Sequence, residues 1–145
     1  MDHTSTHDRR LAILLWFRLA RFYNQSIKAS NKHLEQWQLT TAQFDLLVQV
    51  GAHQPVTQQH LAEKLLVTKG NITHLVKKME ERGLIMRQQD WKTKYLSLTE
   101  EGTTFYEEVV PQQEQFQIDQ FGELDTADQK ELLRLLNILH KQGEN

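Results

Sequence analysis

Residues 68–85, with the sequence TKGNITHLVKKMEERGLI, decide the fold. The apolar residues of this stretch recur at spacings of three and four, which predicts a helix with one buried face. They are Ile72, Leu75, Val76 and Met79. Thr68 is placed to cap the start of this helix, and Gly83 is placed to end it in a left-handed conformation. Because β-prone residues follow Gly83, a strand is expected directly after the helix.

The opposite face of this predicted helix has hydrogen-bonding and basic groups in place of bulky apolar ones. Gly70, Thr73, His74 and Lys77 point away from the buried row, with Asn71 and Lys78 on a flank. Thr68 and Lys69 lie at the amino end, where free backbone amides favour an anion. Such a face either reaches the base edges and phosphates of DNA or is simply solvated.

Two shorter helices are predicted upstream. Thr40 and Gln43 form a capping box, in which each side chain hydrogen-bonds the backbone amide of the other residue. Gly51 is expected to end that helix as a left-handed cap. Thr57 is expected to cap the next helix, which leads into residues 68–85. Three capped helices in a row predict a compact helical trio.

The segment after this trio predicts a β-hairpin. Residues 84–87 and 95–98 are β-prone, and the polar residues 88–94 between them are expected to form a long loop at the tip. This hairpin is basic, since it contains Arg87, Lys92 and Lys94. Trp91 at the tip either packs back on the hairpin or stacks against a sugar. Three helices followed by a basic hairpin are typical of a winged helix-turn-helix, whose wing reaches a phosphate or the minor groove of DNA.

Long helices are predicted on both sides of this core. Residues 9–36 lack Gly and Pro, and their apolar residues cover more than one face, which predicts burial on several sides, one of them against another subunit. Thr99 restarts a helix that runs towards residue 121, and Pro111 is expected to kink or split it. Asp125 caps a last helix with a broad apolar stripe.

The predicted domain organisation is a single domain of residues 1–145. It consists of an N-terminal dimerisation helix (9–36), a winged-helix lobe (40–100) and C-terminal dimerisation helices (101–141). A chain of 145 residues with 39% apolar and 25% charged residues is typical of one folded domain. The net charge of −2 combines a mildly basic front with residues 101–145, which have three Lys and Arg against ten Asp and Glu. This uneven distribution of charge is compatible with one face that binds an anion, and equally with helix faces that are simply solvated.

Several classes of function are excluded. The chain has no cysteine, so it cannot form disulfides, thiolate metal sites or a thiol redox sensor. Its seven histidines form no His-x-x-x-His pair on a predicted helix, so neither a metal nor a cofactor is expected. A Gly-rich phosphate loop and a nucleophile elbow are also missing from the sequence, so no enzyme is expected. The longest apolar run, residues 11–17, is too short to span a bilayer, and the start lacks a basic secretory signal. We therefore expect a soluble, cytoplasmic protein.

Four stretches resemble the MarR family of bacterial transcription regulators. They are residues 39–44 (LTTAQF), 61–65 (LAEKL), 71–85 (NITHLVKKMEERGLI) and 96–102 (LSLTEEG). The resemblance implies a mainly α fold with a small β-hairpin, in which a winged helix-turn-helix core is flanked by N- and C-terminal dimerisation helices. It also implies a homodimer on a palindromic operator of double-stranded DNA, with the helix of about 68–82 in the major groove and the wing in the minor groove. The activity that it implies is repression relieved by a small ligand, often an aromatic or phenolic compound, or by another signal.

The wing departs from the family's pattern. The family usually has Asp-x-Arg there, whereas this chain has Asp90-Trp91-Lys92. Lysine keeps the charge but lacks the planar guanidinium fork. We therefore expect weaker groove readout or an altered role for the wing, with Lys92 and Lys94 as the candidate contacts.

Five aromatic residues are candidates for an effector pocket between the dimerisation helices and the DNA-binding lobe. They are Trp16, Phe17, Tyr23, Trp37 and Phe44. Ordinary core packing is the other interpretation of the same residues.

Two further hypotheses for the whole chain stay open. A winged-helix module that binds proteins without touching DNA would show partner binding that is insensitive to salt. A metal-binding switch would respond to a chelator.

Overall fold

The computed structural model describes residues 5–65 and 69–143, except for the side chains of residues 69, 70, 142 and 143. The elements follow in the order α1 (Thr6–Leu34), η1 (Glu35–Trp37), α2 (Thr41–His53), β1 (Val56–Thr57), α3 (Gln58–Leu65), α4 (Lys69–Glu81), β2 (Ile85–Asp90), β3 (Thr93–Leu98), α5 (Glu100–Asp119) and α6 (Thr126–Gly143). The expected fold class is confirmed, since helices dominate and one small antiparallel sheet follows the helical trio.

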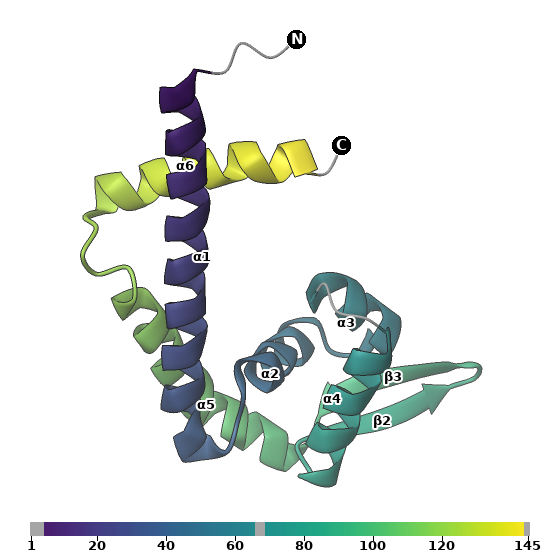
Figure 1. Ribbon diagram of the computed structural model, residues 1–145. Helices are drawn as coiled ribbons and strands as arrows, with labels where there is room; N and C mark the ends of the chain where they lie inside the picture. The colour runs from purple at the N-terminus through teal and green to yellow at the C-terminus, as the bar shows by residue number, and fades with distance from the viewer. Residues whose placement is uncertain (1–4, 66–68, 144–145) are drawn as a thin grey trace.

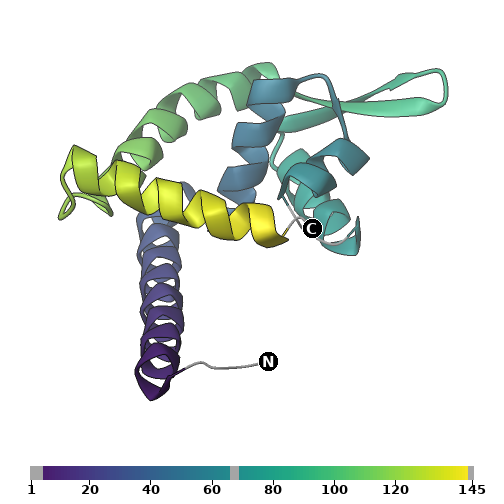
Figure 2. The same cartoon turned by 90° about the horizontal axis from the view of Figure 1, so that it is seen from above.

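The molecule has a lobe and two projecting helices. The lobe consists of α2, α3, α4 and the sheet, and the β2–β3 hairpin extends outward from it (Figure 1). Helix α5 packs against both α1 and α2, so it connects the lobe to the long first helix. The two views show the amino-terminal half of α1 and all of α6 outside the lobe (Figure 2).

The hydrophobic core lies in the lobe and at its junction with α1 and α5. Leu34 at the end of α1 and Val109 in α5 are fully buried, as are Leu47, Leu61 and Val76 of the trio. Most of α1 is exposed, and among the described side chains of α6 none is buried. The lobe thus has its own core, whereas the outer helices leave apolar surface uncovered.

The predicted capping box at the start of α2 is confirmed. The Thr40 hydroxyl accepts from the Gln43 amide at 3.2 Å, and the Gln43 side chain accepts from the Thr40 amide at 3.0 Å. The prediction for Gly51 is wrong, because α2 continues through Gly51 to His53. A Cβ at Gly51 would lie 2.4 Å from the Tyr106 ring, so glycine serves the close approach of α5 rather than a left-handed cap.

The junction between α4, the hairpin and α5 is built around Gly83 and Thr99. Gly83 has a φ of +74°, and the Leu84 amide donates to the Met79 carbonyl at 3.1 Å, so the predicted left-handed end is confirmed. The Thr99 hydroxyl donates to the Gly83 carbonyl at 2.6 Å and accepts from the Gly102 amide at 2.8 Å. One side chain therefore joins the end of the helical trio to the start of α5.

The hairpin differs from the predicted one at its tip. Strands β2 and β3 pair from Ile85↔Leu98 out to Asp90↔Thr93, so the turn has two residues, Trp91 and Lys92. The prediction of a long polar loop over residues 88–94 is wrong. Both faces of the outer hairpin are solvated, so polar residues there are compatible with strands. A third strand, β1, pairs with β3 through Val56↔Leu96, and Thr57 also accepts from the His60 amide as the predicted cap of α3.

The flanking helices differ from the prediction at their ends and at Pro111. Helix α1 begins after Ser5, whose side chain accepts from the Asp8 amide, and η1 follows it. Of the kink or split expected at Pro111, the split is wrong, since α5 continues through this exposed residue to Asp119. Packing of α5 on two other helices supports the turn in which proline removes one backbone donor. Asp125 caps α6 as predicted, with its side chain 2.8 Å from the Asp128 amide.

Candidate nucleic-acid interface

Helix α4 presents the polar face that its periodicity predicts. Ile72, Val76 and Met79 are fully buried. The side chains on the other side are exposed: Asn71, Thr73, His74, Lys77 and Lys78. Thr68 lies outside the described residues, and Lys69 and Gly70 form the first turn of α4 without described side chains. The candidate residues of α4 whose side chains the structure describes thus lie on one solvent-facing side of the helix.

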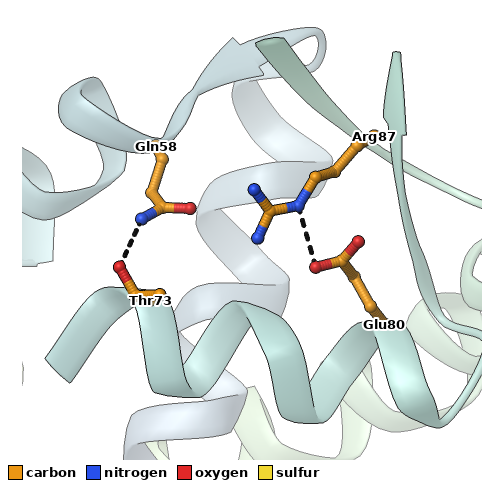
Figure 3. A network of polar contacts seen from close by, with 4 residues as sticks. All are labelled: Gln58, Thr73, Glu80 and Arg87. Atoms are coloured by element: carbon orange, nitrogen blue, oxygen red, sulfur yellow. Dashed lines mark hydrogen bonds and ion pairs between the residues drawn. The ribbon is translucent and has the colours of Figure 1, made fainter. Parts of the chain in front are cut away.

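A hydrogen bond ties this face to the preceding helix. Gln58, at the start of α3, donates from Nε2 to the Thr73 hydroxyl at 2.7 Å (Figure 3). The sequence reasoning missed Gln58, because 15 residues separate it from Thr73 and their meeting depends on how α3 packs on α4. The bond connects the Thr73 side chain on the exposed face of α4 to the start of α3.

An ion pair ties the other end of the same face to the wing. Arg87 Nε of β2 lies 2.9 Å from Glu80 Oε1 of α4, and the two side chains are 33% and 30% exposed (Figure 3). The sequence reasoning missed Glu80 as well, because its contact with Arg87 depends on how the hairpin turns back against α4. The pair places a basic group beside the exposed face of α4, but it also sets a carboxylate against that group.

The hairpin has further basic residues around its outer end. Side chains alternate between the two faces of a strand, so Arg87 shares a face with Gln89 and, across the strands, with Lys94. This face continues from the buried Ile85 and Leu96, which pack in the lobe's core. Lys92 is exposed in the turn itself. The basic groups of the wing therefore lie on its α4 side and at its tip.

Arg82 contacts other parts of the same chain and does not belong to the exposed face of α4. Its guanidinium donates to the carbonyls of Trp37 and Gln38 at 2.9 and 2.8 Å and lies 5.4 Å from the centre of the Phe105 ring. These contacts join the end of α4 to the segment between α1 and α2. Helix α4 is thus fixed to the scaffold at its carboxyl end.

The five aromatic candidates for an effector pocket are spread over different parts of the described residues. Trp16 and Phe17 are exposed on the outer part of α1, Trp37 packs at the edge of the core, and Phe44 is buried in it. Tyr23, also exposed, lines a cavity of about 590 Å³ between α1 and α2.

This α1–α2 cavity combines apolar and polar walls. Its lining comprises Tyr23, Ile27, Asn31, Thr40, Thr41, Ala42, Asp45, Leu65 and Leu75. The Asn31 carboxamide oxygen accepts from both the amide and the hydroxyl of Thr41, at 2.7 and 2.8 Å, which connects α1 to the start of α2. Neighbouring groups withdraw water from the Asp45 carboxylate, and this desolvation raises its pKa above the ordinary value of 3.8.

Other chemistries find little support in the described part of the chain. Within it, no group of three or more His, Asp and Glu side chains is arranged to hold a metal ion. The rings of His53 and His60 lie edge to face with their centres 5.9 Å apart. Among the helices described, none is long and apolar enough to cross a membrane.

Comparisons with known proteins agree with this geometry. The sequence profile of the MarR family matches residues 39–92. An HTH-type transcriptional regulator of Bacillus cereus is 46% identical over 138 residues, which cover 94% of each chain. The Staphylococcus aureus MepR–DNA complex has a TM-score of 0.79 at 21% identity, with 87% of this chain and 95% of that one covered. Staphylococcus aureus MarR, in complex with salicylate and kanamycin, has a TM-score of 0.80 at 21% identity, with 91% of each chain covered.

Proposed function

The chain belongs to the MarR family of winged helix-turn-helix transcription regulators, and we propose that it is a ligand-responsive repressor that binds a palindromic operator as a homodimer. DNA-binding regulation of transcription is the activity of this family, whose members are not enzymes. The observation that carries the proposal is the exposed face of α4, tied at both ends by Gln58–Thr73 and Arg87–Glu80.

The proposed DNA contacts divide by chemistry. Thr73, His74 and Lys77 are central on the exposed face, and we assign them to base edges in the major groove. Lys78 and Arg87 flank that centre and, with Lys69, are assigned to phosphates. We assign Thr68, Gly70 and Asn71 to the start of the helix, where it approaches the sugar–phosphate backbone of DNA. Lys92 and Lys94 of the wing are assigned to the minor groove and its phosphates.

Uncovered apolar surface supports the homodimer. Trp16, Phe17 and Leu15 of α1 are exposed, as are Leu133 and Leu139 of α6. Soluble monomers rarely expose large contiguous apolar patches, and these exposed residues lie on the two helices that project from the lobe (Figures 1 and 2). A two-fold axis would let the same helices of two chains cover one another. The residues Trp16 and Phe17, first considered for an effector pocket, fit this interface better.

The α1–α2 cavity supports the ligand response. Mostly apolar walls with a few polar groups are typical of small-molecule sites, and the ring of Tyr23 suits an aromatic or phenolic compound. Helix α1 belongs to the proposed dimer interface, whereas α2 belongs to the lobe. A ligand that favours another angle between them changes the separation of the two recognition helices, which an operator holds at roughly 34 Å. It shifts the population off DNA by its differential affinity for the two arrangements.

A salt titration of DNA binding tests the proposal. The probe is a duplex from the region upstream of the chain's own gene, with an unrelated duplex as control. A protein that neutralises about 6–10 phosphates shows log affinity falling steeply and linearly with log salt. Lys77→Ala is expected to weaken binding to the upstream duplex while dimerisation and melting temperature stay unchanged, and Lys28→Ala on α1 is the matched control. Equal affinity of wild type and Lys77→Ala would remove the assignment of Lys77.

Salicylate is a suitable first probe of the ligand response, since a structural neighbour is in complex with it. We expect it to raise the melting temperature and to release the upstream duplex, and Tyr23→Ala is expected to weaken both effects. Salt-insensitive binding to a protein, together with failure to bind either duplex at low salt, would favour the protein-interaction module instead.

A further inference from the structure

Trp91 is the most exposed large apolar side chain among the residues that the structure describes. Its exposure is 83%, and it lies in the two-residue turn at the tip of the hairpin. The sequence left open whether the indole packs back on the hairpin or reaches outward, and this exposure shows that it reaches outward. A large apolar ring held in solvent at the end of a projecting hairpin is unfavourable for the isolated chain.

The backbone at Trp91 is also unfavourable for a tryptophan. Its φ is +58°, in the left-handed region, because a two-residue hairpin needs positive φ at its first turn position. Glycine, asparagine and aspartate are the usual residues there. The Gln89 side chain donates to the Trp91 carbonyl at 3.0 Å and so supports this turn. The hairpin therefore holds an indole in an outward position that neither its packing nor its backbone geometry requires.

The charges around the indole indicate its partner. Lys92 Nζ lies 5.0 Å from the centre of the Trp91 ring, and Lys94 lies on the adjacent strand. Asp90 is the acidic residue next to them in the chain. A flat apolar ring beside ammonium groups is complementary to the minor groove of DNA, where apolar sugar surfaces lie between two rows of phosphates.

We propose that Trp91 is the minor-groove residue of the wing, with its indole acting as an apolar wedge against sugars and base edges while Lys92 faces a phosphate. This inference rests on the proposed function, since it needs the wing to meet the same duplex as α4. Apolar side chains inserted in the minor groove favour base steps that unstack easily. The wing is therefore expected to prefer flexible pyrimidine–purine steps beside each half-site, a preference for deformability and not for hydrogen-bond patterns.

The first test uses the emission of the indole itself. The full-length protein has three tryptophans, of which Trp16 and Trp37 lie in other parts of the chain. Addition of the upstream duplex is expected to quench and shift the emission of the wild type and of Trp16→Phe to the same extent. Trp91→Phe is expected to lose most of this change.

The second test separates a DNA contact from a structural role. Trp91→Gly replaces the indole with the residue that the positive φ favours, so the variant is expected to melt at the wild-type temperature or above it. Its affinity for the duplex is expected to fall roughly tenfold for each wing that loses its aromatic contact, and so roughly 100-fold for the two wings of a dimer. The salt slope stays unchanged because no charge is lost, whereas Lys92→Ala lowers the slope by about 0.9 for each phosphate contact that it removes.

The outcomes distinguish this inference from the proposed function. If Lys77→Ala weakens binding while Trp91→Gly keeps wild-type affinity and step preference, the role of Trp91 is overturned and the repressor proposal stands. If the wild type binds neither duplex, both fail. If the emission changes with anionic phospholipid vesicles and not with DNA, the tip belongs to a membrane surface and the inference is overturned.

Discussion

Replacement of Glu80 by glutamine is expected to tighten binding to DNA. The carboxylate lies 2.9 Å from Arg87 Nε at the edge of the exposed α4 face, so it competes with phosphates for that guanidinium. Glutamine has nearly the same shape and keeps an oxygen that accepts from Arg87. The substitution therefore removes one negative charge from each chain and leaves the geometry in place.

The effect on folding is expected to be small. The two side chains are about one third exposed, and an ion pair of this kind contributes roughly 0–1 kcal/mol to stability. Glu80 also lies one residue before the end of α4, where a negative charge is unfavourable to the helix dipole. These two effects oppose each other, so the melting temperature is expected to stay within a few degrees of the wild type.

The effect on DNA binding is expected to be much larger. Each additional phosphate that is neutralised steepens the slope of log affinity against log salt by about 0.9. At about 0.1 M salt this corresponds to a gain of roughly eightfold for one Arg87, and of roughly 60-fold for the two copies of a dimer. Fluorescence anisotropy with the labelled upstream duplex, over a series of salt concentrations, measures both quantities.

Two control variants separate the specific effect from general electrostatics. Glu81→Gln removes the same charge from an exposed neighbour on α4 and is expected to give a smaller gain. In an Arg87→Gln background, Glu80→Gln is expected to lose most of its effect. Equal salt slopes of the wild type and Glu80→Gln would refute the reasoning, and a loss of affinity would show that Glu80 orients Arg87 for DNA instead of competing with it.

Three further substitutions test the scaffold and the cavity. Gly102→Ala would place a Cβ 2.0 Å from the Leu84 carbonyl oxygen, so urea unfolding should show a loss of about 1–3 kcal/mol or more; wild-type stability would contradict this close approach. Arg82→Lys loses the fork that holds two backbone carbonyls, and a loss of about 1–2 kcal/mol is expected, whereas an unchanged unfolding midpoint would mean that these bonds contribute little. The pKa of Asp45 is raised in the folded protein, so this carboxyl group contributes to the stability of the fold at low pH. That contribution is lost as pH rises through the pKa of the folded protein. Asp45→Asn should therefore raise the melting temperature at neutral pH and have little effect below the ordinary value of 3.8; an equal gain at both pH values would point to another cause.

Features that depend on neighbours in sequence were predicted correctly. The capping box of Thr40 and Gln43, the left-handed end at Gly83 and the cap at Asp125 each involve residues within a few positions of one another. The buried row of α4 follows from its spacing for the same reason, because a helix places residues three and four apart on one face. The exposed face of α4 was therefore predictable, while its proposed contacts with DNA stay predictions until binding is measured.

The errors lie where long-range packing overrides a local signal. Gly51 is a local signal for a helix end, but the approach of Tyr106 from α5 explains this glycine inside α2. Pro111 signals a break, but packing on α1 and α2 keeps α5 continuous. The polar tip of the hairpin resembled a loop because a strand with two solvated faces has no alternation to detect.

The sequence by itself determined the order of the helices and the hairpin and the exposed face of α4, because periodicity and caps act over a single turn of chain. Its resemblance to known regulators over four stretches indicated the family. Tertiary structure alone decided that Gln58 holds Thr73, that Glu80 pairs with Arg87, and that Trp91 projects into solvent. Each of these depends on how one element packs or turns against another. The distances involved are set by the shared core of the lobe, and no pattern within one element encodes them.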